Sequence, residues 1–240
     1  TPSLRFKFDD PVLFSEISTS YTQRIYANNS KKNDNPFAFN GIVRWQAMKE
    51  TLFFEVSDVY ARVSRDVTRD YTQESSFANQ TDSNTFTLHP YLVLRLSSQL
   101  TLTTGYKFID IWYKDPASVD KRDHVGYVQA QYEAMTNLLI TANYTATREE
   151  AKTYDFWRHQ ISVGPKYMYA KDSFVSVNVG NTWVNYDQGS GYSSPYFAAV
   201  VSYAFDTSAL TLSASQMYTE NADTAPVSYT HLTLPTNREV

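Results

Sequence analysis

Apolar and polar residues alternate with a period of two over much of this chain. In the segment 86–97, Leu88 and Leu92 fall on one side of an extended backbone, and His89 and Arg95 fall on the other. The same alternation recurs at 100–108, 138–145, 175–180, 197–205 and 210–215. Because successive side chains of a strand point to opposite faces, this pattern predicts β-strands with one apolar face and one polar face.

The predicted strands are joined alternately by short turns and by long polar connections. Short turns are expected at 9–11, 47–50, 97–99, 134–137, 170–172 and 206–208. Long connections are expected at 28–36, 69–83, 114–123, 148–155, 187–195 and from about residue 220 onward. From the third short turn the pattern repeats about every 36 residues. Outer-membrane barrels have this organisation, with short periplasmic turns and long outer loops.

A repeat of this length also suits helical repeats and β-propellers. Helical repeats need apolar residues at a spacing of about 3.6, and propeller blades usually hold four strands, whereas each repeat here holds two. The predicted strands exceed the mean of about 5–6 residues for strands and reach the roughly 9–11 that cross a bilayer at a tilt. The sequence therefore predicts an all-β fold, an antiparallel up-and-down transmembrane β-barrel in the outer membrane of a Gram-negative cell.

The predicted strands number about twelve, from Leu4–Phe8 to Leu210–Tyr218. The first runs away from the long-loop side and the last returns to it. Since bacterial barrels usually have an even strand number and begin and end in the periplasm, the whole barrel is expected to have about 14 strands or more. The chain is thus expected to be an incomplete barrel, an open sheet whose two edges do not close.

The end of the chain has a pattern of a different kind. Residues 227–236 back-translate to a sequence that resembles the adapter of transposon-based sequencing libraries, and the preceding adapter bases complete a codon for Pro226. We therefore expect a native barrel fragment over 1–226 and a translated, non-native tail over 227–240. The alternative is an ordinary Thr/Leu strand with a charged tail, and the segment 227–234 tolerates extension well enough to pair as a strand in either case.

Composition agrees with a two-faced sheet in a membrane. Aromatic residues make up 15% of the chain, yet its charged fraction is 19% and its mean hydropathy is −0.44. The absence of cysteine excludes disulfides and thiolate chemistry. A net charge of −4 without a basic run argues against a nucleic-acid partner. No apolar run approaches the roughly 18 residues of a membrane-spanning helix.

The polar side of the alternation predicts a lumen-facing set of residues. These are Arg44, Arg95, Lys107, Gln129, Gln131, Asn143, Gln160, Lys166, Asn178 and Ser213. One interpretation is a hydrated passage whose cations attract anionic or hydroxyl-rich solutes. The other is that inward charges pair with one another and fill the interior. The segment 52–63 fits less well, because Asp58 and Arg62 continue the apolar face of Leu52, and a β-bulge is expected there.

Aromatic residues cluster near the predicted strand ends at the long loops. We expect Tyr106, Phe108, Trp112, Tyr113, Trp157, Trp183 and Tyr186 at a membrane interface, where an apolar ring with a polar group is favoured. Cross-strand aromatic pairs in a soluble sheet are the alternative.

No residue set predicts catalysis, so the chain is not expected to be an enzyme. His89 falls on the polar face as a hydrogen-bonded wall residue, and His159 aligns with the apolar face near a loop. The segment 185–191 has oxygen donors and glycines but lacks the ligand spacing of a calcium loop. We expect no cofactor and no metal. The expected partners are outer-membrane lipid and a polysaccharide or another polar solute, and the oligomeric state is left open.

Three stretches resemble a family of outer-membrane β-barrel proteins associated with PEP-CTERM and exopolysaccharide systems. They are Thr103–Phe108 with Ile111–Asp115, Asn178–Asp187 and Leu210–Glu220, and the resemblance spans roughly residues 84–226. It implies an export or surface role for a barrel. It brings no catalytic residues with it.

Overall fold

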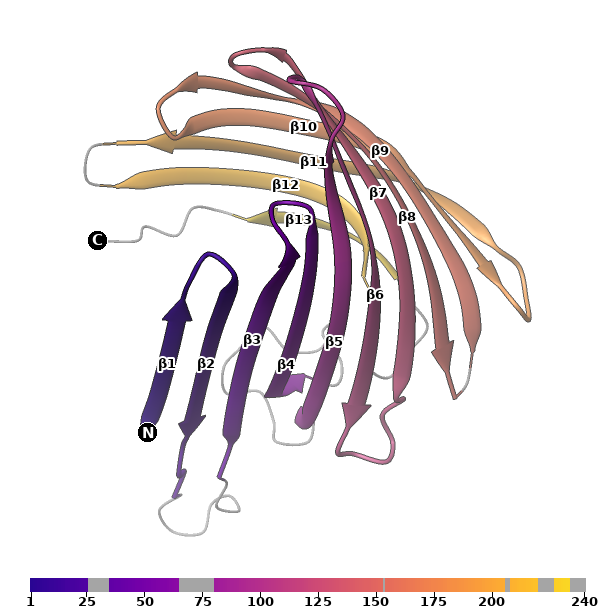
Figure 1. Ribbon diagram of the computed structural model, residues 1–240. Helices are drawn as coiled ribbons and strands as arrows, with labels where there is room; N and C mark the ends of the chain where they lie inside the picture. Colours follow the sequence, from indigo (N-terminus) through magenta and orange to yellow (C-terminus); the bar gives the residue numbers. More distant parts are fainter. Residues whose placement is uncertain (26–34, 65–79, 153, 206–207, 220–226, 234–240) are drawn as a thin grey trace.

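The computed structural model describes residues 1–25, 35–64, 80–152, 154–205, 208–219 and 227–233. Within these residues it contains thirteen strands: β1 (Ser3–Asp9), β2 (Leu13–Tyr21), β3 (Phe37–Met48), β4 (Leu52–Ser64), β5 (Gln80–Arg95), β6 (Leu100–Tyr113), β7 (Lys121–Met135), β8 (Leu138–Ala151), β9 (Asp155–Ala170), β10 (Ser173–Tyr186), β11 (Tyr192–Ala204), β12 (Ala209–Thr219) and β13 (Val227–Thr233). Each strand pairs antiparallel with the next, and the sheet curls like part of a barrel (Figure 1). The all-β, up-and-down prediction is confirmed.

All twelve predicted strands are present, and the sheet is open. Its order runs from β1 to β13, so these two strands are its edges. β13 lies in the expected tail and pairs with β12 from Thr219 opposite Val227 to Ser213 opposite Thr233. The segment therefore takes the extended form that its Thr and Leu residues tolerate. The adapter origin of residues 227–240 stays a prediction.

The two faces of the sheet differ in what they expose, as β9 illustrates. Ile161 and Val163 are exposed on one face, while Ser162 and Gly164 are buried on the other. Residues directly opposite across a strand pair share a face, so the register extends this division to every strand. We call the face of Ile161 the outer face and the face of Ser162 the inner face. Inner-face positions are the more buried because the sheet curls toward them.

The short turns form one end of the sheet, which we call the short-turn end. Glu50 and Asp172 have positive φ angles of 55° and 57°, and they close the turns after β3 and β9. Three irregularities of register lie beside these turns, at Gln46/Met48, Glu133/Met135 and Ser173/Phe174. Extra residues at strand ends let the chain reverse sharply without disturbing the pairing of the strand interiors.

The strands extend further toward the opposite end, the long-loop end, than the sequence predicted. β7 begins at Lys121, β8 continues to Ala151 and β11 begins at Tyr192, so residues expected in loops are paired in strands. Cross-strand ion pairs explain the extension at Arg122, whose Nε donates to Asp110 Oδ1 over 2.9 Å. The expected connections at 28–36, 69–83 and beyond 220 fall largely outside the described residues.

The bulge expected in 52–63 is absent. β4 pairs with β5 without interruption, from Leu52 opposite Leu92 to Ser64 opposite Gln80. Asp58 and Arg62 therefore do continue the outer face. Asp58 Oδ1 accepts a hydrogen bond of 2.9 Å from Asn84, and Arg62 Nε donates to Asp82 over 2.8 Å. The face itself becomes polar toward the long-loop end, and no change of register is needed.

Candidate functional site: the inner face of the sheet

The register places the ten predicted lumen residues on the inner face. Gln129 lies opposite Asn143, Lys166 lies opposite Ser176, and Gln160 lies opposite Thr182. The residues paired with the other six predicted positions place those positions on the same face. They are Arg44, Arg95, Lys107, Gln131, Asn178 and Ser213. Period-two alternation alone was enough to assign this face. That these residues line a lumen stays a prediction.

A chain of polar contacts crosses β3, β4, β5 and β7 on the inner face. Arg44 Nε donates to Glu55 Oε2 over 2.8 Å, and Glu55 Oε1 lies 3.7 Å from His89 Nδ1. His89 Nε2 and the Tyr127 hydroxyl are 2.8 Å apart and share a hydrogen bond. The contact between Glu55 and His89 is too long for a hydrogen bond. His89 is therefore a hydrogen-bonded residue of the inner wall, as the sequence suggested.

Aromatic rings stack beside this chain of contacts. The ring centroids of Phe53 and Tyr91 are 5.0 Å apart, with an interplanar angle of 11°. The His89 ring stacks on Tyr91 at 4.7 Å, and Tyr127 is tilted against His89 at 5.7 Å. We call Phe53, His89, Tyr91 and Tyr127 the inner ring cluster. Each ring is fixed by a neighbour, so this part of the inner face is a preformed surface.

Two inner-face lysines, Lys107 and Lys166, lie over aromatic rings. Lys107 Nζ lies 5.7 Å from the centroid of Tyr127, and Lys166 Nζ lies 4.0 Å from that of Phe174. Within the described residues, neither ammonium group has a carboxylate within 4.0 Å. Arg44, by contrast, is held by Glu55, and Arg95 pairs with Glu50 over 3.1 Å. Arg44 and Arg95 are thus paired, while Lys107 and Lys166 have no described carboxylate partner, and the choice between a passage and a filled interior stays a prediction.

Five of the seven predicted interface aromatics share the outer face. These are Tyr106, Phe108, Trp112, Trp157 and Trp183, of which all but Phe108 are exposed. The two outer-face histidines lie among them, since His124 Nδ1 bonds the Tyr106 hydroxyl at 2.5 Å and His159 Nδ1 bonds the Tyr144 hydroxyl at 2.9 Å. Their position at a membrane interface stays a prediction.

Tyr113 and Tyr186 lie on the inner face, apart from the other five, and their position at an interface stays a prediction. Tyr113 directly follows Trp112, and Tyr186 stands three residues after Trp183, so alternation turns both toward the inner face. Tyr113 lies opposite Ser83, and Tyr186 lies opposite Phe156, whose ring it meets edge-on at 5.5 Å. Proximity to a loop is not sufficient to predict an interface residue, because parity along the strand decides the face.

The inner face at the long-loop end is closely packed. Phe156 and Val184 are fully buried there and are the only buried hydrophobic residues in the described part of the chain. Glu149 is also fully buried, with Lys121 Nζ 3.9 Å from its Oε1. Glu149 falls within the connection expected at 148–155, and the packing of Phe156 and Val184 was not predicted. The available signal was the alternation of Phe156, Arg158 and Gln160, which continues the inner face of β9 to its first residues.

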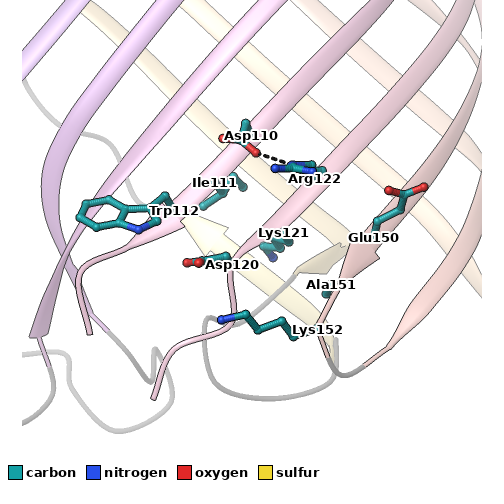
Figure 2. A pocket seen from close by; sticks show the side chains of 9 residues that line it. All are labelled: Asp110, Ile111, Trp112, Asp120, Lys121, Arg122, Glu150, Ala151 and Lys152. Carbon is teal, nitrogen blue, oxygen red and sulfur yellow. Dashed lines mark hydrogen bonds and ion pairs between the residues drawn. The ribbon is translucent and has the colours of Figure 1, made fainter. Parts of the chain in front are cut away.

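The outer face at the same end carries charges. Figure 2 shows Arg122 beside Asp110, with Glu150 and Lys152 nearby. These residues line an open cavity of about 410 Å³ at the ends of β6, β7 and β8. Farther along, both terminal nitrogens of Arg148 donate to the Asp187 carboxylate over 2.7 Å. These bonds hold the pKa of Asp187 below its ordinary value because they favour the ionised carboxylate.

Other kinds of site are not evident in the described part of the chain. No group of three or more His, Asp or Glu residues there could hold a metal ion. Among the same residues, no helix is long and apolar enough to cross a membrane. The arrangement suits binding by stacking, hydrogen bonds and charge, with the inner ring cluster as its most organised part.

Comparison with known protein families and with curated proteins gives no match. Among solved structures, the chain is similar to OmpT, an outer membrane protein of Vibrio cholerae, with 9% identity and a TM-score of 0.46 over 98% of this chain and 91% of that one. It is also similar to the alcaligin outer membrane receptor FauA of Bordetella pertussis, with 16% identity and a TM-score of 0.38 over 88% and 39% of the two chains. At these values neither likeness identifies a family, an activity or a ligand.

Proposed function

We propose that this chain is part of a β-barrel of the bacterial outer membrane and that its inner face lines a passage for sugars or exopolysaccharide. The observation that carries the proposal is the distribution of side chains, which is the inverse of that in a water-soluble protein. Ile161, Val163 and Val179 are each 49% exposed on the outer face, whereas the inner face is mainly polar. Exposing such an apolar face to water would cost free energy, and contact with lipid removes this cost.

The lengths of the strands support the membrane placement. β5 and β9 have 16 residues each, which is more than the roughly 9–11 needed to cross a bilayer at a tilt. The surplus lies at the long-loop end, where the outer face carries Asp110, Arg122 and Arg148. This end projects into water outside the cell in the proposed orientation, and the short turns face the periplasm.

The passage is supported by the polar groups that the inner face leaves available. Lys107 and Lys166 leave positive charge on the wall, and the amides of Gln129 and Gln131 form no hydrogen bond with another described group. Such groups attract and hydrate polar solutes. The exopolysaccharide association rests on the resemblance of segments in β6, β10 and β12 to the PEP-CTERM-associated barrels.

A structural or adhesion barrel with a plugged lumen is the alternative, and one observation favours it. Phe156 packs against Tyr154 and Tyr186 with centroid distances of 6.1 and 5.5 Å, and these rings lie on the inner face at the long-loop end. A barrel closed at its outer mouth would need such packing. The proposal includes no catalytic step.

Single-channel recording separates the two functions. The completed barrel, inserted in a planar bilayer, is expected to give stable conducting steps. Lys107→Glu and Lys166→Glu should each shift ion preference from anions toward cations, whereas Lys171→Glu, at the short turn after β9, should not. Inserted protein that never conducts would refute the passage and support the plugged barrel. Recovery of the chain from the soluble periplasm, in place of the outer-membrane fraction, would refute the membrane placement.

A further inference from the structure

We propose that Tyr91, Tyr127 and Lys107 form a subsite for saccharides that carry carboxylate groups, extended along β7 by Gln129 and Gln131. The inference rests on the proposed sugar passage and specifies its solute as an acidic one. It requires a sugar-stacking surface, a cation beside that surface, and hydrogen-bonding groups that face the same space. The inner ring cluster and its neighbours provide all three.

The surface depends on a glycine. Tyr91, Gly105 and Tyr127 lie opposite one another on β5, β6 and β7. A Cβ atom at residue 105 would stand 2.7 Å from Tyr91 Cβ and 2.8 Å from the Tyr127 hydroxyl oxygen. Only a residue without a side chain lets the two tyrosines converge over the backbone of β6. A glycine inside a strand often marks such a close approach.

The two tyrosines are held before any ligand arrives. Tyr91 stacks with Phe53 and with His89, and the Tyr127 hydroxyl is hydrogen-bonded to His89. Binding therefore does not have to order these rings, which preserves affinity that flexible side chains would lose. The apolar C–H face of a sugar ring packs on aromatic surface, while its hydroxyls remain available to polar neighbours.

The charge at this surface selects for an anion. Glu55 is the carboxylate of this region, and it is engaged by Arg44 at 2.7 Å. Lys107 lies beside Tyr127, and no described carboxylate lies within ion-pair distance of it. An acidic sugar on the tyrosines would bring its carboxylate to this ammonium group. A charge-assisted hydrogen bond of this kind is roughly twice as strong as a neutral one.

The amides extend the subsite along one strand. Gln129 and Gln131 follow Tyr127 at every second position of β7, so the three side chains stand on the same face. Gln131 is exposed and Gln129 half-buried. Each amide offers two donors and an acceptor, which match the neighbouring hydroxyls of a sugar. A chain of several sugar units could therefore lie along β7.

Binding to the completed barrel in detergent micelles tests the subsite without using conductance. The probes are a hexasaccharide of galacturonic acid and maltohexaose, measured by calorimetry and by saturation-transfer NMR from the aromatic protons. We expect the acidic probe to bind about tenfold more tightly than the neutral one, and Lys107→Gln to remove the difference. Gly105→Ala should abolish saturation transfer. Gly126→Ala is the matched control, because a Cβ there meets nothing within 4 Å.

Equal affinity for the two probes would overturn the proposal, and so would acidic binding that survives both Lys107→Gln and Gly105→Ala. If Gly105→Ala fails to fold, Tyr91→Leu replaces it, and unchanged saturation transfer in that variant counts against the subsite. The outcome is separable from the proposed function. Acidic binding by a chain that never conducts refutes the passage alone, and conduction without acidic binding refutes the subsite alone.

Discussion

The two ends of β9 and β10 distribute their side chains in opposite ways. In the middle of these strands and toward the short turns, Ile161 and Val179 are exposed on the outer face and Ser162 is buried on the inner face. At the long-loop end Phe156 and Val184 are fully buried on the inner face, and Asn185 stands on the outer face. The same strands thus follow one rule at one end and the reverse rule at the other.

In the proposed orientation this reversal marks where the surroundings of the sheet change from lipid to water, and the buried inner face at the watery end also holds the Lys121–Glu149 pair. Apolar residues turn inward and charged residues outward where water surrounds a protein, and the order is inverted where lipid does. Trp157 and Trp183 stand on the outer face at the change, and the charged pairs Asp110–Arg122 and Arg148–Asp187 lie at or beyond it. In the proposed orientation the long-loop end is stabilised like a soluble protein and the rest of the sheet by its contact with lipid.

The largest effect is expected from Phe156→Ala at the long-loop end. Removing a fully buried ring that contacts Tyr154 and Tyr186 should lower the free energy of unfolding by about 3–5 kcal/mol. Urea titration of the completed barrel folded into lipid vesicles would measure it. Phe197→Ala is the control, because that ring is 38% exposed on the outer face and should cost about 1–2 kcal/mol. Equal costs would show that the long-loop end has no core of its own.

A smaller effect should distinguish lipid from water on the outer face. Val179→Arg places a charge in the middle of the apolar face and should cost about 2–4 kcal/mol in vesicles. Asn185→Arg lies on the same face of the same strand, at the long-loop end, and should cost at most about 1 kcal/mol. Unfolding titrations of both variants in the same vesicles provide the comparison. A negligible cost at Val179 would mean that this face does not contact lipid.

Much of this fold follows from the sequence because alternation is a local property. The period-two alternation predicted the twelve strands and the face on which Gln129 and Lys166 lie. The interruptions of this alternation predicted the short turns. Tyr113 and Tyr186 were expected beside the other interface aromatics because they lie near loops, and the same alternation places them on the inner face. The strand ends were missed because charged residues such as Arg148 and Glu149 are typical of loops, and only pairing across strands shows that they belong to the sheet.

The inner ring cluster could not be predicted in the same way. Phe53, Tyr91 and Tyr127 stand on different strands, and their contact depends on the register between those strands, which no local pattern fixes. Gly105 was a partial signal, since a glycine within a predicted strand suggests close approach by a neighbour. Which neighbours approach it depends on pairings that only the folded sheet determines.

The smallest effect concerns the charged outer rim and its response to pH. Because the two hydrogen bonds from Arg148 lower the pKa of Asp187 in the folded chain, their stabilisation is complete above the ordinary aspartate value of about 3.9 and is lost as the pH falls through the lower, folded value. The difference in urea midpoint between the parent chain and Asp187→Asn should therefore be constant from neutral pH down to about pH 5 and shrink below pH 4. Salt at 1 M should reduce the difference at neutral pH, since this pair is exposed to solvent. A difference that grows on acidification would mean that Arg148 does not favour the ionised carboxylate and that the rim is held together by its backbone pairing alone.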